Sequence, residues 1–199
     1  MPPAPSPANV AAALAAAVQE YRHDSDVGAL LDRVKALVRD APPEGLADAA
    51  APFADLPEVV IPVYERIVDA RPTEAQPMVV LANAYWLTGR GSAVVGDLAE
   101  RARSADPRNR GAWHLWALAE SDPRDRMERW RAVSEQFPAD QLARAALADN
   151  AASVAGAEHD PHALDLAVAT YEGLWAEASR DEERRALEET IEKLKGWKL

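Results

Sequence analysis

Marker residues recur along this chain at intervals near 34 residues, and that period limits most strongly how the chain can fold. A large residue followed by alanine recurs at intervals of 35 and 31 residues, at Leu81–Ala82, Trp116–Ala117 and Leu147–Ala148. Prolines that close apolar stretches keep the same two intervals, at Pro72, Pro107 and Pro138. Bulky residues recur between them at intervals of 34, 32 and 41 residues, at Tyr64, Leu98, Trp130 and Tyr171. Three series with nearly one period predict stacked copies of one supersecondary unit.

Each repeated unit is predicted to be a pair of helices, for example over residues 75–88 and 92–104. A strand would place Leu81, Ala82 and Tyr85 on conflicting faces, whereas a helix brings them onto one stripe. Alanine beside a large residue lets two helices approach closely, while the large residue fills the gap between them. We therefore expect an all-α fold of α-α hairpins stacked as a short solenoid.

Three parts are expected within one compact unit. Residues 1–43 form an N-terminal helical hairpin, with Ser6 as the N-cap and Pro7 in the first helical turn. Because the first basic residue is Arg22, this start does not fit a secretion signal. Residues 44–181 carry the repeats. Residues 182–199 form a capping helix that covers the last repeat, with Trp197 holding its end.

Over residues 44–178 the sequence resembles the tetratricopeptide repeat (TPR) family. One repeat matches the family pattern at Met78, Leu81–Ala82, Tyr85, Leu98, Ala102 and Pro107. The next matches it at Trp113, Trp116–Ala117, Trp130 and Pro138. The repeats are degenerate, since Glu120 stands where tyrosine is usual and the last repeat lacks its closing proline. The resemblance implies a right-handed solenoid whose concave groove receives a peptide or a partner subunit.

The resemblance also implies which side chains line that groove, because the family uses the second face of each first helix. The corresponding residues here are Val79, Asn83, Trp86, Arg90, His114, Leu118, Ala145 and Asp149. Trp86 is the leading contact candidate and Asn83 can bond a peptide backbone; alternatively, Trp86 packs against a neighbouring helix. Val79 replaces the lysine with which some family members bind a C-terminal carboxylate. Trp113, Trp116 and Trp130 are expected in the core.

Charge narrows the possible partners. The formal net charge is −11, which disfavours nucleic acid and anionic membranes because both attract basic surfaces. Residues 101–131 form a local exception, with eight arginines against five acids and a net charge of +3, which either attracts an acidic segment or forms surface salt bridges. The chain has no cysteine and no apolar run long enough to span a bilayer. These features fit an acidic cytoplasmic protein.

No arrangement of residues predicts catalysis or a cofactor. Gly89–Arg90–Gly91 lacks the rest of a phosphate-binding loop, and no serine lies in a glycine-flanked elbow. One cluster resembles a metal site, because His159 and His162 stand three residues apart beside carboxylates. The competing interpretation is a helix-connecting turn with Asp160 as the N-cap and Pro161 in the first helical position.

The sequence therefore favours a non-catalytic scaffold or adaptor that binds a protein or peptide in a helical groove. A second hypothesis is a structural subunit or a self-associating assembly protein, which would form homo-oligomers. A third, less favoured, is a metal-dependent enzyme using His159 and His162. An RNA-binding helical repeat ranks last, because the net charge has the wrong sign.

Overall fold

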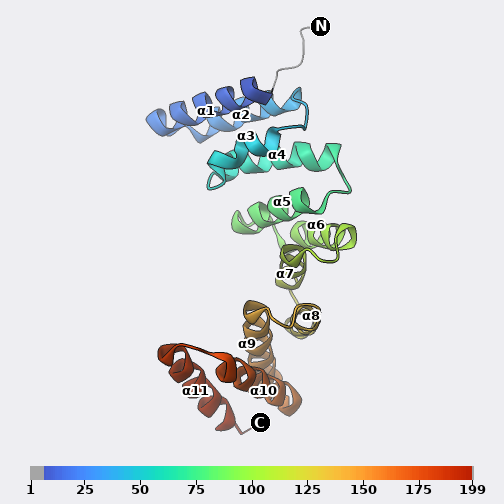
Figure 1. The fold of residues 1–199 in the computed structure, drawn as a ribbon, viewed down its shortest axis with the longest axis vertical. Helices are drawn as coiled ribbons and strands as arrows, with labels where there is room; N and C mark the ends of the chain where they lie inside the picture. The colour runs from blue at the N-terminus through green and yellow to red at the C-terminus, as the bar shows by residue number, and fades with distance from the viewer. Residues whose placement is uncertain (1–6, 199) are drawn as a thin grey trace. The chain divides into compact units, whose positions relative to one another are not determined.

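The computed structural model describes residues 7–198, and these residues form helices and turns without a strand (Figure 1). Ser6, the expected first N-cap, lies outside the described residues. The helices up to the middle of the chain are α1 (Pro7–Asp24), α2 (Val27–Arg39), α3 (Leu46–Ala50), the short 3-10 helix η1 (Ala51–Phe53), α4 (Pro57–Ala70), α5 (Ala75–Leu87) and α6 (Ser92–Ala105). The remaining helices are α7 (Arg110–Leu118), α8 (Pro123–Gln136), α9 (Gln141–Glu158), α10 (Pro161–Glu177) and α11 (Asp181–Lys195). The predicted all-α class is confirmed.

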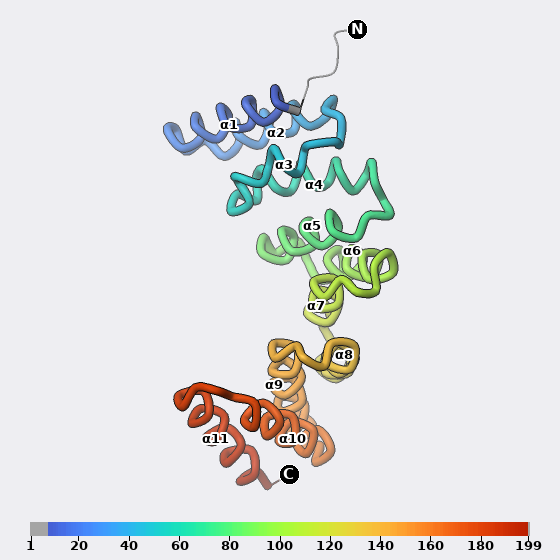
Figure 2. The backbone as a smooth tube through the Cα atoms, in the orientation of Figure 1, coloured from blue at the N-terminus to red at the C-terminus, as the bar shows by residue number. Residues whose placement is uncertain are grey.

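The helices group into two compact units, one ending at Ala112 and one beginning at Trp113. In the first unit α1 packs against α2 and α3, α2 packs against α4, and α5 packs against α4 and α6. In the second unit α9 packs against α8 and α10, and α11 packs against α10. Within each unit, consecutive helices run back and forth as hairpins (Figure 2). The division into an N-terminal hairpin, repeats and a capping helix stays a prediction.

One turn occurs three times, after α4, α6 and α8. In each copy a C-cap residue donates its N–H to the carbonyl four residues earlier, and the next residue is Pro72, Pro107 or Pro138. The C-cap carbonyl then accepts the N–H of the residue three positions later, at 3.2, 3.0 and 2.9 Å. Proline has no N–H to donate and disfavours the helical conformation of the residue before it, so these positions favour a helix end, although α4 accommodates Pro62 in its interior. The predicted role of these prolines as helix ends is confirmed.

Aspartate side chains cap the start of four helices. Asp26, Asp122, Asp140 and Asp160 each accept a backbone N–H in the first turn of α2, α8, α9 and α10. Such caps satisfy donors that have no partner inside the helix. The expected cap at Asp160 and the helix start at Pro161 are both present.

The residues that recur at intervals near 34 positions pack into the cores of the two units. Ala82, Ala117 and Ala148 have 0 % of their surface exposed. The bulky markers Leu98, Trp130 and Tyr171 are also buried. Trp113 and Trp116 pack edge-on, 5.7 Å apart, against the core of the second unit. Of the three tryptophans expected inside, Trp130 is buried, and Trp113 and Trp116 are partly buried against the same core.

Helix α11 packs its apolar side chains against the core of the second unit. Ile191 and Leu194 are buried, and Leu187 packs against the same core. Beyond the helix, the Trp197 ring lies over Gly156 of α9, since a Cβ on Gly156 would stand 3.2 Å from its Cζ3 atom. Glycine thus permits a close approach that fixes the end of the chain.

Replacing Ala148 by leucine tests whether the buried alanines set the helix spacing. Ala148→Leu forces extra atoms between α9 and its neighbours, and we expect unfolding free energy to fall by ~1–3 kcal/mol. Urea unfolding followed by circular dichroism measures the change. Ala157→Leu places the same substitution at an exposed position of the same helix and should change stability by less than ~0.5 kcal/mol. Equal stabilities of the two variants would contradict this packing argument.

Candidate functional site

The residues expected to line a groove divide between the two compact units. Val79, Asn83, Trp86 and Arg90 belong to the first unit, at α5 and the turn after it. His114, Leu118, Ala145 and Asp149 belong to the second unit, on α7 and α9.

Helix α5 presents an exposed face in the first unit. Asn83 is exposed, Trp86 retains 38 % of its surface and Leu87 retains 72 %. Asn83 and Trp86 lie three residues apart, which makes them neighbours on a helix surface. Within residues 7–198 the Asn83 amide forms no hydrogen bond to the protein. The structure thus brings together the two leading contact candidates and leaves both accessible.

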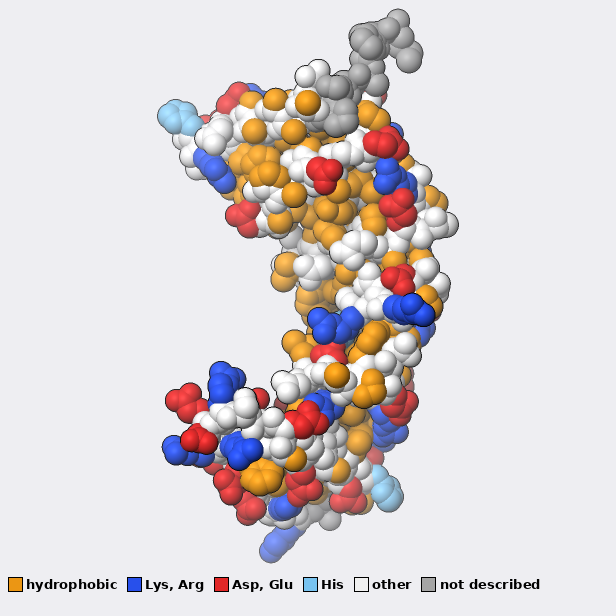
Figure 3. Space-filling model, in the orientation of Figure 1, with side chains coloured by type: hydrophobic (Ala, Val, Ile, Leu, Met, Phe, Trp, Pro, Cys, Tyr) orange, Lys and Arg blue, Asp and Glu red, His pale blue; other side chains and the backbone are white. Residues whose placement is uncertain are grey.

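Beside this face lies a pocket of about 170 Å³, here called the α3–α5 pocket. Its apolar walls come from α3, η1, α4 and α5 and include Ala50, Ala54, Val60, Val80, Ala84 and Leu87. Its polar groups are Asp55, Tyr64 and Asn83. Figure 3 shows hydrophobic side chains gathered over these helices. An engineered apolar cavity of ~150 Å³ accepts benzene, so the pocket has room for one large apolar side chain.

Val79 and Arg90 face other parts of the first unit. The Cγ1 atom of Val79 stands 3.0 Å from where a Gly111 Cβ would be, so Val79 packs against the start of α7. Arg90 lies 3.7 Å from the Glu65 carboxylate and 5.0 Å from the centre of the Tyr85 ring. The Tyr85 hydroxyl donates to Glu65 at 2.6 Å, and burial together with this bond raises the pKa of Tyr85 to about 12. Arg90 therefore completes a cluster with α4.

The expected groove residues of the second unit contact their own unit. His114 Nε2 lies 2.7 Å from the carboxylate of Asp140, which is buried, and its ring meets Trp130 edge-on. Leu118 packs against the core, and Asp149 accepts the hydroxyl of Tyr171. These contacts give His114, Leu118 and Asp149 structural roles inside the unit.

The arginines between residues 101 and 131 are largely engaged by neighbouring polar groups. Arg103 pairs with Glu100 at 2.8 Å and Arg131 with Glu128 at 3.1 Å. Arg126 donates to Asn150, and Arg129 donates to the Trp116 carbonyl at 2.8 Å. The salt-bridge interpretation of this basic stretch therefore has more support than an open cationic surface.

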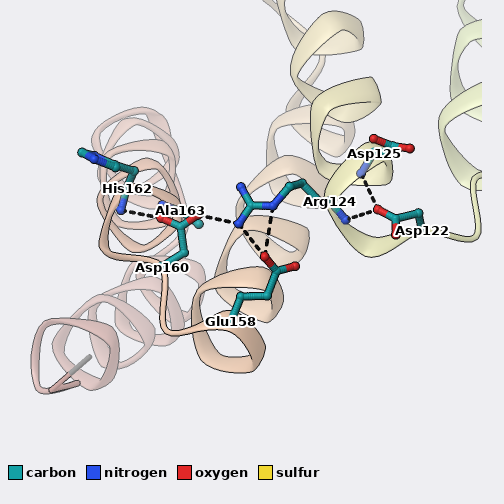
Figure 4. A network of polar contacts seen from close by, with 7 residues as sticks. All are labelled: Asp122, Arg124, Asp125, Glu158, Asp160, His162 and Ala163. Atoms are coloured by element: carbon teal, nitrogen blue, oxygen red, sulfur yellow. Dashed lines mark hydrogen bonds and ion pairs between the residues drawn. The ribbon is translucent and has the colours of Figure 1, made fainter.

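Arg124 connects the start of α8 to the turn between α9 and α10 (Figure 4). Its guanidinium reaches Glu158 and Asp160, each at 2.6 Å. Asp160 also accepts the backbone N–H of His162, whose imidazole points away from Arg124. The carboxylates beside His159 and His162 thus bind a cation of the chain itself, and residues 7–198 hold no cluster of three metal-ligating side chains.

The Arg124 contacts predict an acid-dependent contribution to stability. The bond to Arg124 is the main cause that holds the pKa of Asp160 below its ordinary 3.8. A lowered folded-state pKa stabilises the protein above the ordinary value and loses that effect as pH falls through the folded value. Arg124→Gln should therefore lower the urea midpoint at pH 7 and leave it nearly unchanged near pH 2.

Arg131→Gln removes the same charge from the same helix, where Arg131 pairs with Glu128 at 3.1 Å three residues earlier. It should cost less at pH 7 than Arg124→Gln, because pairs within a helix contribute little. If Arg124→Gln lowers the urea midpoint by the same amount at both pH values, the ionised carboxylates do not cause the change.

The architecture defines a class of fold, the stacked helical hairpin of the TPR type, and solved structures confirm it. A "MamA" crystal structure aligns with a TM-score of 0.56 and 15 % identity, covering 87 % of this chain and 95 % of that one. A thermophilic TPR protein from Thermus thermophilus aligns with a TM-score of 0.52 and 19 % identity, covering 94 % of this chain and 98 % of that one. No family model and no curated protein matches the sequence. At these identities the likeness establishes the fold.

Sequence reasoning missed the walls of the α3–α5 pocket other than Asn83. Helix α3 has five residues and begins after Gly45, whose φ of 78° is a left-handed conformation that suits glycine. So short a helix has no periodic stripe to detect. The sequence signal that marks this part of the chain is its charge, because residues 40–65 contain six acids and no Lys, Arg or His. The helices of the described residues include none long and apolar enough to cross a membrane.

Proposed function

We propose that this chain is a non-catalytic cytoplasmic adaptor or scaffold that binds a peptide segment of a partner protein on the α5 face of its first unit. The observation that carries the proposal is the α3–α5 pocket, which accessible Asn83 lines and whose wall helix α5 also carries exposed Trp86. Binding sites combine an apolar recess with a few polar groups that fix orientation. The pocket supplies the recess, and Asn83 supplies a donor and an acceptor for a peptide backbone.

The chemistry of the surface supports binding over catalysis. The described titratable groups with shifted pKa values are held by ion pairs, backbone caps or burial, as at Asp160 and Tyr85. A preformed helical surface needs little reordering on binding, which lowers the cost of association.

Trp86→Ala tests the proposed face. Tryptophans at the centre of interfaces often contribute about 2 kcal/mol or more, so Trp86→Ala should weaken partner binding about tenfold or more. The measurement is affinity capture with mass spectrometry, followed by calorimetry with the purified partner. Trp175→Ala is a matched control, because Trp175 is 41 % exposed and lies on α10 of the second unit.

Three results are informative. Loss of binding in Trp86→Ala with retention in Trp175→Ala supports the α5 face. Unchanged affinity in Trp86→Ala contradicts the proposal. Equal weakening by both variants would mean either that the contact lies elsewhere or that both variants have lost structure. Circular dichroism of each variant distinguishes these two explanations.

A further inference from the structure

The α3–α5 pocket is acidic as well as apolar, and its charge indicates which peptide it receives. Residues 40–65 include α3, η1 and most of α4. This stretch contains six Asp or Glu residues and no Lys, Arg or His. Helix α5, the remaining wall, has no charged residue between Ala75 and Leu87. Among the pocket's lining residues the sole charged side chain is Asp55. The pocket therefore has carboxylate charge and no basic group to offset it.

Some carboxylates of this stretch already have partners. Glu44 binds Arg71 at 3.1 Å, and Glu65 lies 3.7 Å from Arg90 while accepting the Tyr85 hydroxyl. Arg71 and Arg90 are thus paired with carboxylates, and Arg66 of α4 donates to the Ala41 carbonyl at 3.4 Å. Glu58 lines a different hollow, together with Lys35 and Arg90. The carboxylates next to the α3–α5 pocket are Asp55, which lines it, and Asp48 on α3.

Asp48 and Asp55 stand at the pocket without a cation. In the described part of the chain neither carboxylate forms a hydrogen bond or an ion pair. Asp55 lines the pocket, and Asp48 lies on α3 three residues before the lining residue Ala51, a spacing that makes the two neighbours on a helix surface. Burial of the Tyr64 phenol, which also lines the pocket, and then the Asp48 charge raise the pKa of that phenol. Both acids are thus near enough to act on a group bound there.

We propose that the α3–α5 pocket binds a basic–apolar peptide segment, with one Leu- or Met-sized side chain in the recess and a neighbouring Lys or Arg at Asp48 and Asp55. This specificity rests on the proposed function, since it names the peptide that the same face receives. The recess of about 170 Å³ selects the apolar side chain. The unpaired carboxylates select the cation and reject an acidic neighbour, because charge complementarity favours one sign and disfavours the other.

Four fluorescent heptapeptides test the proposal on the full chain. They carry Lys-Leu-Lys, Ser-Leu-Ser, Glu-Leu-Glu or Lys-Ser-Lys between Gly-Ser ends, and fluorescence polarisation measures their affinity at low and high salt. Lys-Leu-Lys should bind most tightly, Glu-Leu-Glu most weakly, and Lys-Ser-Lys should lose the apolar contribution. Raised salt should weaken Lys-Leu-Lys binding, because exposed ion pairs are screened.

Three variants locate the binding. Asp48→Asn with Asp55→Asn should weaken Lys-Leu-Lys roughly three- to tenfold and reduce its salt dependence. Asp32→Asn with Asp97→Asn changes the net charge equally on α2 and α6, away from the pocket, and should leave affinity nearly unchanged. Ala54→Leu narrows the pocket at an exposed position and should weaken Lys-Leu-Lys and Ser-Leu-Ser together.

The outcomes separate this proposal from the function on which it rests. If Ser-Leu-Ser or Glu-Leu-Glu binds as tightly as Lys-Leu-Lys and Ala54→Leu weakens it, the charge preference is overturned while a peptide-binding pocket stands. Absence of binding by every peptide, together with Trp86-dependent capture of a partner, overturns the pocket's role and leaves the α5 face. A concentration-dependent dimer that Ala54→Leu abolishes, seen by sedimentation, overturns the proposal because a second copy would occupy the pocket.

Discussion

Close contact between helices at fully buried alanines is the constraint on which the other features of each unit depend. Ala82, Ala117 and Ala148 have no exposed surface, and each follows a large residue in the first helix of a pair. A methyl side chain lets helix axes come within ~8 Å, near the lower limit for packed helices. The large neighbour and the bulky marker of the second helix then fill the space on either side. With these faces committed to the core, each first helix has one remaining face for solvent or a partner.

The period made the helices predictable because one side-chain pattern serves each core contact. The expected helix over 75–88 corresponds to α5, Ala75–Leu87, since Pro72 and Gly89 limit it on both sides. The contacts of the remaining face followed less well from sequence. His114 and Asp149 occupy groove positions of the family, yet Asp140 and Tyr171 bind them inside the second unit. Those partners lie 26 and 22 residues away in the sequence. The helical period predicts which residues share a face of one helix, and it does not predict contacts between residues so far apart.

Charge gives a second kind of information that periodicity does not contain. The arginines of residues 101–131 look like an exposed cationic stretch in sequence, but they bind acceptors on their own helices and on the neighbouring helix α9. Acids of residues 40–65 look like ordinary solvated charge, but Asp48 and Asp55 remain unpaired beside an apolar recess. Net charge is therefore a weak guide to partners for this chain. The local balance between carboxylates and their cations is the informative quantity.

The pocket also depends on the fold, since all of its walls belong to the first unit. Ala50 and Val60 line the pocket on their own helices and are buried at 2 % and 6 % exposure, so wall and core are continuous. Asn83, Ala84 and Leu87 stand on α5, whose Leu81 and Ala82 are buried in the same unit. A surface supported in this way is held in place before a ligand arrives, which favours recognition by preformed shape over folding upon binding. Because α3, α4 and α5 all belong to the first unit, the recess is complete without any residue of the second.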